Sequence, residues 1–403
     1  MENFEIIDHG GVTSPLGFRA AGVEAEIKKD RKDLAVIFSD VPAAVAGVFT
    51  TNRVKAAPLV VTGEHIKNGR AQAIVVNAGN ANACTGEQGQ ANAVATAQKA
   101  GGLLQIDPND VIVTSTGVIG VQLPMDRVLT GVEKAVGALY RNGGADAARA
   151  IMTTDTVPKE IAVEFTLSGK KAIIGAMAKG SGMIHPNMAT MLGFVTTDAA
   201  VSPALLDQAL KFAVNKTFNM VTVDGDTSTN DMVVVLANGL SGGPEIKAEN
   251  EDFNIFCDAL LYVCTYLAKL IAKDGEGATK LVEVRVVNAG TEEDAKKAAK
   301  AIANSNLVKT AIFGEDANWG RIICAVGYSG AQFDPARVDI TIGDEKMCAD
   351  GTPLNFSEER AKKILERDEV AILVDLKDGA AEATAWTCDF SYDYVKINAD
   401  YRT

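Results

Sequence analysis

The segment from Lys179 to Asp198 holds the residues best suited to covalent chemistry. It reads KGSGMIHPNMATMLGFVTTD, so Thr190 follows Ala189 and precedes the apolar run MLGFV. A threonine that follows a small residue at the start of a buried strand is what a self-cleaving N-terminal-nucleophile protein needs. The Thr190 hydroxyl would attack the Ala189 carbonyl, an N-to-O acyl shift would give an ester, and water would release the new chain.

Cleavage would leave Thr190 with a free α-amine beside its own hydroxyl. Such an amine has an ordinary pKa of about 7.7–8.0, so its neutral fraction can accept the hydroxyl proton. A base held covalently beside the nucleophile removes the need for histidine, and the chain has only 3 histidines. The same local pattern also occurs at ordinary strand starts, so this segment alone leaves both interpretations open.

Thr116 and Gly117 are candidates for stabilising the oxyanion that forms in acyl transfer. They follow the apolar run VIVTS, which begins at Val111, and a glycine lets a backbone N–H approach a ligand closely. Removal of one such donor slows acyl transfer by roughly 10²–10³-fold. The alternative interpretation is a plain turn at the end of a strand.

Composition excludes several other classes of site. The chain has 403 residues, with 39 Lys and Arg against 52 Asp and Glu, and a net charge of −13. We therefore expect no nucleic-acid partner, because phosphate binding needs a basic surface. The most apolar helical segment, 256–272, contains Asp258 and Lys269. It is typical of a core helix, and we expect no membrane association.

Metal and disulfide chemistry are also not expected. The cysteines form no CxxC pair and lie far apart, at positions 84, 257, 264, 324, 348 and 388. This spacing predicts reduced thiols in a cytoplasmic protein, and we interpret Cys84 as a buried packing residue. The loop DGDTSTND resembles a calcium loop at Asp224 and Asp226, but Thr229 and Val235 stand where glycine and glutamate are required. We expect this loop to support the active-site architecture, with no metal and no resident cofactor.

Strands and helices come in blocks along the chain. Strand-like runs rich in Val and Ile begin at Leu34, Val45, Ala73, Val111, Ile161, Lys171, Met232, Leu281, Val338 and Val370. Apolar periodicity and capping residues predict helices over 124–140, from Pro203, over 252–272, after Thr291 and after Ser357. In the helix from Pro203 the predicted buried stripe is Leu205, Leu206, Leu210, Phe212 and Val214. Blocks of this kind favour an α+β fold over a doubly wound one.

The chain resembles the ornithine acetyltransferase family, whose members are also called bifunctional glutamate N-acetyltransferases of arginine biosynthesis. Eight motifs carry the resemblance in order over nearly the full length, with the cleavage sequence intact. They are NAGNANACTGEQG (77–89), TSTGVIG (114–120), TTDTVPK (153–159), KGSGMIHPNMATML (179–192), VDGDTSTND (223–231), KDGEGATK (273–280), GEDANWGR (314–321) and INADYRT (397–403).

The resemblance implies a self-processing fold of the N-terminal-nucleophile type, with sheets covered by helices in an αββα-like sandwich. The precursor would cut itself between Ala189 and Thr190. The products would be an α chain of residues 1–189 and a β chain of residues 190–403. These two chains would stay intertwined and assemble as an α2β2 heterotetramer.

The resemblance also implies a ping-pong reaction. N2-acetylornithine would acetylate Thr190, ornithine would leave, and glutamate would take the acetyl group to give N-acetylglutamate. Family members differ in whether they also accept acetyl-CoA as a donor, and we expect the bifunctional kind. Thr116 and Gly117 would form the oxyanion hole.

Substrate binding is assigned by the resemblance to residues scattered along the chain, namely Thr153, Lys179, Thr190, Glu276, Asn398 and Thr403. Zwitterionic substrates need a cation for the α-carboxylate and anions or carbonyls for the amines. Lys179 is expected in a Gly-rich turn, and the glycines that flank Glu276 would let it approach a ligand. The chain end is predicted to be ordered and buried near Thr190.

Two other functions stay open at the level of sequence. An N-terminal-nucleophile amidohydrolase or aminopeptidase would share the fold and use water in place of glutamate. Aminopeptidases of that kind use serine, so Thr190 and the NADYRT terminus favour the transferase. A non-enzymatic binding protein would stay uncleaved and run as one band on a denaturing gel.

Overall fold

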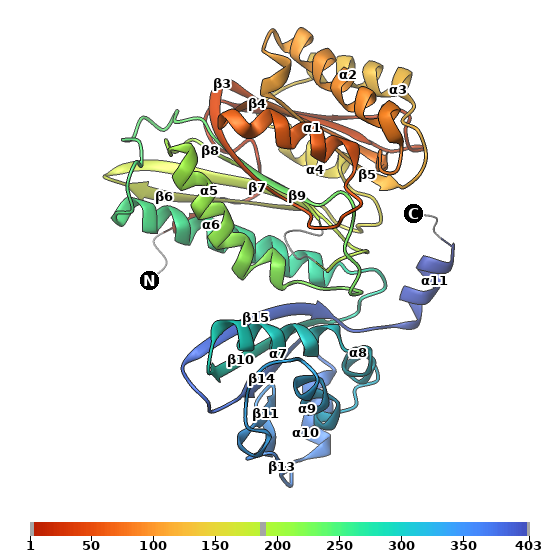
Figure 1. Ribbon diagram of the computed structural model, residues 1–403, viewed down its shortest axis with the longest axis vertical. Coiled ribbons are helices and arrows are strands. Elements are labelled where there is room, and N and C mark those ends of the chain that lie inside the picture. Colours follow the sequence, from red (N-terminus) through yellow and green to blue (C-terminus); the bar gives the residue numbers. More distant parts are fainter. Residues whose placement is uncertain (1–3, 186–190, 401–403) are drawn as a thin grey trace.

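The computed structural model describes residues 4–185 and 191–400, which form two lobes (Figure 1). The upper lobe is built on a nine-stranded sheet with the order β1-β6-β7-β8-β9-β3-β4-β5, in which β2 pairs with β3. Its strands are β1 (Phe4–Ile6), β2 (Phe18–Val23), β3 (Leu34–Phe49), β4 (Arg70–Asn80), β5 (Val111–Val118), β6 (Lys159–Leu167), β7 (Lys170–Lys179), β8 (Leu192–Thr197) and β9 (Met232–Ala237).

The strand β3 joins two halves of this sheet. The runs that begin at Leu34 and Val45, which the sequence presents separately, form one strand of 16 residues. Its first part pairs with β2 and β4, and its second part pairs with β9. The register with β4 shifts between Phe38 and Ala43. Such an irregularity bends a strand and increases its twist, which lets one sheet turn back on itself.

Alternating side chains show that the two halves face each other. Ile37 of β3 and Val234 of β9 belong to one buried cluster between the halves. Their neighbours Val36 and Val235 belong to two other clusters, on opposite outer faces. Because successive residues of a strand point to opposite faces, each half has one inner and one outer apolar face. The strands of both halves therefore carry near-continuous apolar runs.

Helices cover both outer faces. They are α1 (Ala57–His65), α2 (Gly86–Leu104), α3 (Met125–Gly137), α5 (Pro203–Lys216) and α6 (Glu251–Lys273), whereas α4 (Gly144–Ala150) contributes to the cluster between the two halves. The first three helices cover the β2–β5 half, whereas α5 and α6 cover the β6–β9 half (Figure 1). The layers run helix, sheet, sheet, helix, which confirms the predicted α+β class and its αββα-like sandwich.

The buried face of α5 differs from the prediction at one residue. Phe212 is 38% exposed, so its place in the predicted stripe is wrong. Ala209 and Ala213 are fully buried instead, beside Leu206 and Leu210. These four residues repeat at steps of three and four and so share one helical face.

The helix α6 is long and apolar enough to cross a membrane by length and composition alone. Within the protein, however, 56% of its most apolar window is buried. It packs against β6, β7 and α5, and also against strands of the lower lobe. It is therefore a core helix, as its internal Asp258 and Lys269 predict.

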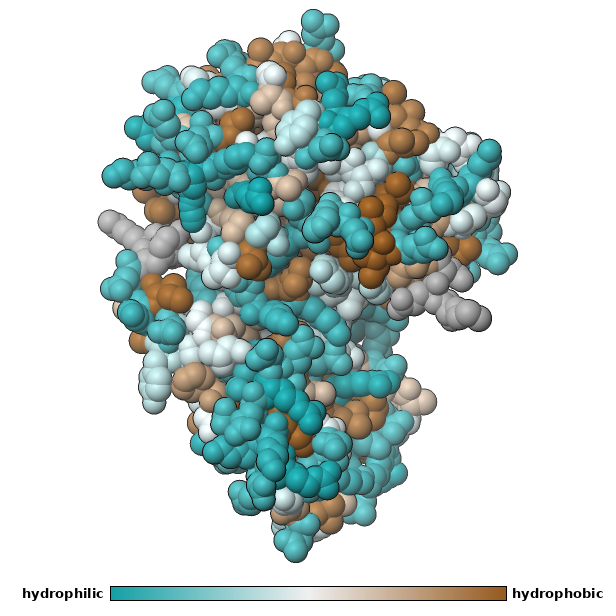
Figure 2. Space-filling view, turned by 180° about the vertical axis from the view of Figure 1, so that it is seen from behind, coloured by the Kyte–Doolittle hydropathy of each residue, from teal (hydrophilic) through white to brown (hydrophobic). Residues whose placement is uncertain are grey.

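The lower lobe is built on a six-stranded sheet with the order β13-β12-β11-β14-β10-β15. Its strands are β10 (Leu281–Ala289), β11 (Asp339–Ile342), β12 (Glu345–Ala349), β13 (Thr352–Pro353), β14 (Glu369–Asp375) and β15 (Ala381–Cys388). Its helices are α7 (Glu292–Asn304), α8 (Asn306–Phe313), α9 (Trp319–Gly327) and α10 (Glu358–Leu365), and α11 (Tyr392–Asp400) follows the sheet. Seen from behind, hydrophilic residues cover most of this lobe (Figure 2).

Two predicted helix caps are confirmed in the lower lobe. The Thr291 hydroxyl accepts a hydrogen bond from the Asp294 N–H at 3.1 Å. The Ser357 hydroxyl accepts one from the Arg360 N–H at 3.2 Å. In both cases the side chain satisfies an N–H that the first helical turn leaves unpaired.

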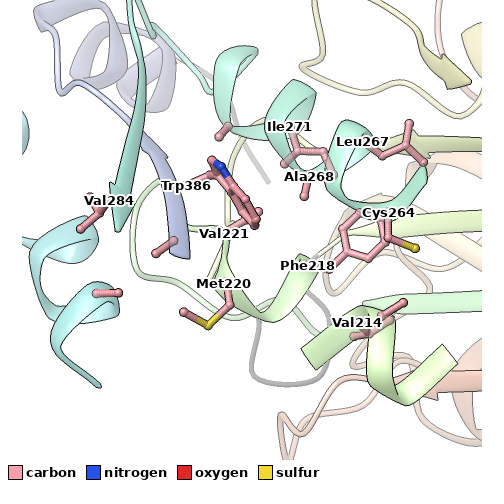
Figure 3. Packing of buried hydrophobic residues seen from close by; sticks show 14 of the residues in the cluster. Val214, Phe218, Met220, Val221, Cys264, Leu267, Ala268, Ile271, Val284 and Trp386 are labelled. Atoms are coloured by element: carbon pink, nitrogen blue, oxygen red, sulfur yellow. The ribbon is translucent and has the colours of Figure 1, made fainter. Parts of the chain in front are cut away.

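The two lobes share one hydrophobic core. Figure 3 shows Trp386 of β15 beside Val221, near Ile271 of α6. The Trp386 carbonyl accepts a hydrogen bond from the Thr222 N–H at 2.9 Å. The same cluster of buried residues continues to Val284 in β10. The lower lobe is thus packed onto α6 and is not a separately cored unit.

Candidate active site

A pocket of about 250 Å³ opens where strands of the larger sheet end. Its wall contains Thr116, Gly117, Ile119, Thr153, Thr154, Lys179, Gly182, Met183, Asp224, Asp226, Ser228, Thr229, Asn230, Glu276, Tyr394 and Asn398. Every predicted site residue that the structure describes lies on this wall: Thr116, Gly117, Thr153, Lys179, Glu276 and Asn398. Ala189, Thr190 and Thr403 lie outside the described residues. The fold brings distant parts of the chain together here, while the role of each residue stays a prediction.

Gly117 lies near the end of β5, pressed against the neighbouring strand. It pairs with Gly79 of β4 at a point where the register is irregular, and its φ is +132°. A Cβ on Gly117 would lie 2.3 Å from the Gly79 carbonyl carbon and 2.6 Å from the Asn80 nitrogen. Only glycine fits both this φ and this contact, so its backbone rather than a side chain faces the pocket.

Lys179 is the last residue of β7, so its predicted position in a Gly-rich turn is wrong. The turn begins one residue later, at Gly180. The antiparallel register pairs Lys179 with Leu192, the first residue of β8. This pairing brings Lys179 next to the start of β8, although the loop between them contains 12 residues (191 − 179).

The chain also returns to the pocket wall directly after the segment 186–190. Met191 is 4% exposed and lines a small adjoining pocket together with Thr116, Lys179 and Asn230. Met191, the first described residue after this segment, therefore lies beside Thr116 and Lys179, two of the predicted site residues.

Glu276 follows α6 and is 7% exposed, which rules out a surface position for it. Its backbone N–H donates to the Ser181 carbonyl at 3.0 Å, and its Oε2 accepts from the Asn398 amide at 2.8 Å. Neither flanking glycine lines the pocket. A Cβ on Gly275 would lie 2.9 Å from the Cys388 sulfur, so this glycine permits close protein packing.

The C-terminal helix α11 reaches the pocket by one face only. The predicted burial of this end is wrong for the described residues, because none of those in α11 is buried and Tyr392 is 84% exposed. Figure 1 shows the helix extending from the body. Tyr394 donates from its hydroxyl to Asp224 at 3.3 Å, and Asn398, one turn later, contacts Glu276. These hydrogen bonds, together with packing of the Tyr394 ring against Phe390, hold α11 at the pocket.

The loop 223–231 supplies further acidic groups. Asp224 accepts from the backbone N–H of Met183 at 2.6 Å and from that of Ile184 at 2.9 Å, and burial raises its pKa. Asn230 donates to the carbonyls of Ala81 at 2.6 Å and Ser115 at 2.8 Å. The loop thereby joins the turn before β8 to the ends of β4 and β5, which supports the architectural role predicted for it.

Several wall residues were not predicted as site residues from the sequence. They are Ile119, Thr154, Gly182, Met183, Asp224, Asp226, Ser228, Thr229, Asn230 and Tyr394. Two signals could have identified some of them. The motif 223–231 is a long polar run between buried strands, and Tyr394 precedes Asn398 by four residues, which places both on one helical face.

A buried ionic network lies beside the pocket. Lys159 is fully buried, with its Nζ 2.8 Å from Asp155 and 2.5 Å from Asp274. The Nζ of Lys179 lies 4.0 Å from Asp155. Burial opposes ionisation of Asp155, but the charges of Lys179 and Lys159 outweigh it and hold the pKa of Asp155 well below its usual range.

A further basic group lies close to this network. Lys28 donates to the Met152 carbonyl at 2.5 Å. Burial, and then the charges of Arg31 and Lys179, lower the pKa of Lys28 to about 8. Arg31 in turn donates to the Thr153 carbonyl at 3.0 Å. Both side chains thus bind the backbone of the segment that carries Thr153.

Other potential sites lack the predicted chemistry. A second cavity of about 370 Å³ lies between α5, α6 and β15, lined in part by Lys216, Met220 and Trp386. It contains no predicted site residue. Across residues 4–185 and 191–400, no three His, Cys, Asp or Glu side chains lie close enough to hold a metal ion. The six cysteines are free, but Cys84 is exposed, so its predicted burial is wrong.

Comparison with known proteins confirms the resemblance drawn from the motifs. The sequence profile of the ArgJ family matches residues 19–403. The arginine biosynthesis bifunctional protein ArgJ of Symbiobacterium thermophilum is 59% identical over 397 residues, which cover 98% of this chain and 99% of the relative. The protein of the same name from Caldanaerobacter subterraneus subsp. tengcongensis is 57% identical over 403 residues, which cover 99% and 100% of the two chains.

A solved structure agrees with these sequence matches. It is the crystal structure of the arginine biosynthesis bifunctional protein argJ from Bacillus halodurans, with 52% identity and a TM-score of 0.52. The match covers 53% of this chain and 100% of that chain. On the profile and the near full-length relatives together, this chain belongs to the ArgJ family.

Proposed function

We propose that this enzyme of arginine biosynthesis transfers the acetyl group of N2-acetylornithine to glutamate through an acetyl ester of Thr190. The curated relatives are named for arginine biosynthesis. The observation that carries the proposal is the composition of one pocket. It combines Lys179 with the carboxylates of Asp224 and Glu276, beside Thr116.

This combination of charges suits amino-acid substrates. A zwitterion with a second amine needs a cation for its carboxylate and anions for its amines, and opposite charges within a few ångströms attract strongly where water is excluded. Lys179 and Glu276 are 8% and 7% exposed, so both charges lie in a largely dry wall. We infer that Lys179 binds the α-carboxylate, that Glu276 and Asn398 bind an amine, and that Thr153 and Thr403 make further contacts.

The chemistry follows from a free Thr190 α-amine. The amine takes the proton of the Thr190 hydroxyl, whose oxygen attacks the acetyl carbonyl of N2-acetylornithine. Thr116 and Gly117 stabilise the resulting oxyanion. The C–N bond then breaks, and the ornithine amine leaves with the proton. Glutamate next attacks the acetyl-Thr190 ester through its own amine, which releases N-acetylglutamate and restores the hydroxyl proton.

Self-cleavage at Ala189–Thr190 is the step that creates this amine. Residues 190–403 number 214 (403 − 189), which is 53% of the chain. The Bacillus halodurans chain matches over its full length and also covers 53% of this chain. A chain of this length in a relative supports processing into an α chain of 1–189 and a β chain of 190–403, and we propose that these assemble as α2β2.

The curated relatives are named bifunctional, which supports a second donor of the acetyl group besides N2-acetylornithine. We propose that acetyl-CoA also acetylates Thr190, with free CoA as the leaving thiol. Release of CoA from a mixture of protein, acetyl-CoA and glutamate tests this step. A rate no higher than the spontaneous hydrolysis of acetyl-CoA would restrict the enzyme to acetyl recycling.

Mass analysis followed by an acetyl-transfer assay tests the main proposal. Active protein should contain a chain that begins TMLGF, and it should convert N2-acetylornithine and glutamate into ornithine and N-acetylglutamate. Thr190→Ala should stay uncleaved and inactive, whereas Thr190→Ser should cleave and transfer slowly. Formation of acetate without N-acetylglutamate would favour an amidohydrolase, and one intact chain in an inactive protein would favour a binding protein.

A further inference from the structure

The motif TTDTVPK contains a second group of residues besides Thr153. Its lysine, Lys159, is the first residue of β6 and is fully buried. A buried ammonium needs charged or polar partners, because loss of hydration is costly. Its nearest partners are Asp155 of the same motif and Asp274, just after α6.

Asp155 connects this lysine to two segments of the pocket wall. Its carboxylate accepts from the backbone N–H of Thr153 at 3.0 Å and from that of Gly180 at 2.7 Å. Gly180 directly follows Lys179. The positions of both Thr153 and Lys179 are therefore fixed through one carboxylate.

Asp274 connects the same lysine to the third segment. Its side chain accepts from the Thr156 N–H at 3.0 Å, and its carbonyl accepts from the Ser181 hydroxyl at 2.7 Å. The Ser181 carbonyl in turn accepts from the Glu276 N–H at 3.0 Å. Glu276 lies two residues beyond Asp274, so this chain of bonds fixes the backbone from which its carboxylate extends.

From these contacts we propose that Lys159 is a positioning residue, which acts through Asp155 and Asp274 to hold Thr153, Lys179 and Glu276 in the geometry that binds substrate. The inference rests on the proposed function of the pocket. It assigns Lys159 no contact with the substrate. Because the network lies behind the pocket wall, it should affect binding of the acetyl donor N2-acetylornithine and of the acetyl acceptor glutamate alike.

The network predicts a specific kinetic change. Misplacement of binding groups by about 1 Å costs up to about 10²-fold in rate, and loss of binding that substrate and transition state share raises KM while kcat stays unchanged. The double variant Lys159→Met with Asp274→Asn removes one positive and one negative charge, which keeps the buried charge balanced. We expect KM for N2-acetylornithine and for glutamate to rise together by at least about tenfold, with kcat within about threefold.

Asp339→Asn is the matched control. Asp339 is also a buried carboxylate between two lysines, Lys346 at 2.5 Å and Lys377 at 2.6 Å, and it also accepts a backbone N–H. It lies in β11, in the lower lobe, and does not line the pocket. This variant should lower the midpoint of thermal unfolding and leave both KM values unchanged.

Three measurements on each processed variant decide the inference: the thermal midpoint, kcat and the two KM values. If the double variant does not fold, Asp274→Asn alone should give a smaller rise in both KM values. Unchanged KM values in a folded variant would overturn the inference, as would an equal rise in Asp339→Asn. Wild-type transfer is measured first, so its absence would count against the proposed function and not against the network.

Discussion

At the scale of single residues, the pocket depends on positions where only one side chain fits. Gly117 is such a position, because the adjacent backbone of Gly79 leaves no room for a Cβ. The glycine at position 117 of the motif TSTGVIG is therefore needed for a steric reason as well as a chemical one. A residue that must lack a side chain is well suited to present its N–H to a developing negative charge.

Gly117→Ala should slow acetyl transfer by roughly 10²–10³-fold, the cost of one lost oxyanion donor. The new Cβ would collide with the Gly79 backbone and shift the end of β5. Gly120→Ala is the control, because Gly120 also has a positive φ of +78° but no atom within 4 Å of its Cβ position. Steady-state kinetics of both variants test this prediction, and equal losses would attribute the effect to backbone strain alone.

Burial of the Glu160 carboxyl should make the stability of the folded protein depend on pH. Burial raises the pKa of this β6 carboxyl from 4.5 to about 7. The folded state therefore favours the protonated form of Glu160. This preference stabilises the fold fully below pH ~4.5, and the stabilisation is lost as the pH rises through ~7. Glu160→Gln should raise the thermal midpoint at pH ~8 and change it little at pH ~4.5.

The control for this change is Glu164→Gln on the same strand, where Glu164 forms an ion pair with the mostly exposed Lys171. That variant should gain no stability at high pH. Unfolding curves at both pH values are the measurement. A midpoint of Glu160→Gln that stays below wild type at pH ~8 would contradict the assigned effect of burial.

At the scale of elements, α11 is attached differently from the other helices. None of its described residues is buried, and its contacts with the pocket are the hydrogen bonds of Tyr394 and Asn398. Its apolar contacts include the packing of Tyr392 against Phe313 and of Tyr394 against Phe390, but a helix with no buried residue has low local stability. It can therefore be displaced without unfolding the body of the protein.

Gly277→Ala should separate α11 from the pocket. Gly277 has a φ of +70°, and a Cβ there would lie 2.4 Å from the Tyr394 nitrogen. We expect at least about tenfold weaker substrate binding, because Asn398 would lose its place beside Glu276. The thermal midpoint should match that of the control Gly330→Ala, where φ is also positive at +78° and the space is open.

Deletion of residues 401–403 tests the same end of the chain. If Thr403 contacts the substrate as proposed, the deletion should reduce activity strongly and leave the unfolding midpoint unchanged. Activity assays and thermal unfolding of the truncated protein decide this. Full activity would remove Thr403 from the site.

At the scale of the whole molecule, the two lobes unfold as one unit if their shared core controls stability. Trp386 is 5% exposed and lies where α6 meets the lower sheet. Trp386→Ala should destabilise the protein by about 3–5 kcal/mol, as for other large-to-small changes in cores. Calorimetry should show one transition at a lower temperature. Two separate transitions would mean that the lobes have independent cores.

The sequence by itself determined most of the buried strands and which residues could act, but it did not predict β1, β2, β12, β13 or β15. Val and Ile runs form strands wherever alternate residues can be buried, so strands such as β5, β9 and β14 are found where the pattern predicts them. The motifs identified Lys179 and Glu276 without knowledge of their distance. Local signals suffice here because strand formation, helix capping and motif matching depend on neighbouring residues.

Only the tertiary structure decided which segments meet. The union of two apolar runs in β3, the exposure of Phe212 and the position of Tyr394 at the pocket depend on packing between distant elements. The same holds for Lys159, which the sequence presents as one more charged residue. Its partners Asp155 and Asp274 are separated by 119 residues (274 − 155). Such a pair forms only because β6, β7 and the end of α6 converge, and that convergence is a property of the whole core.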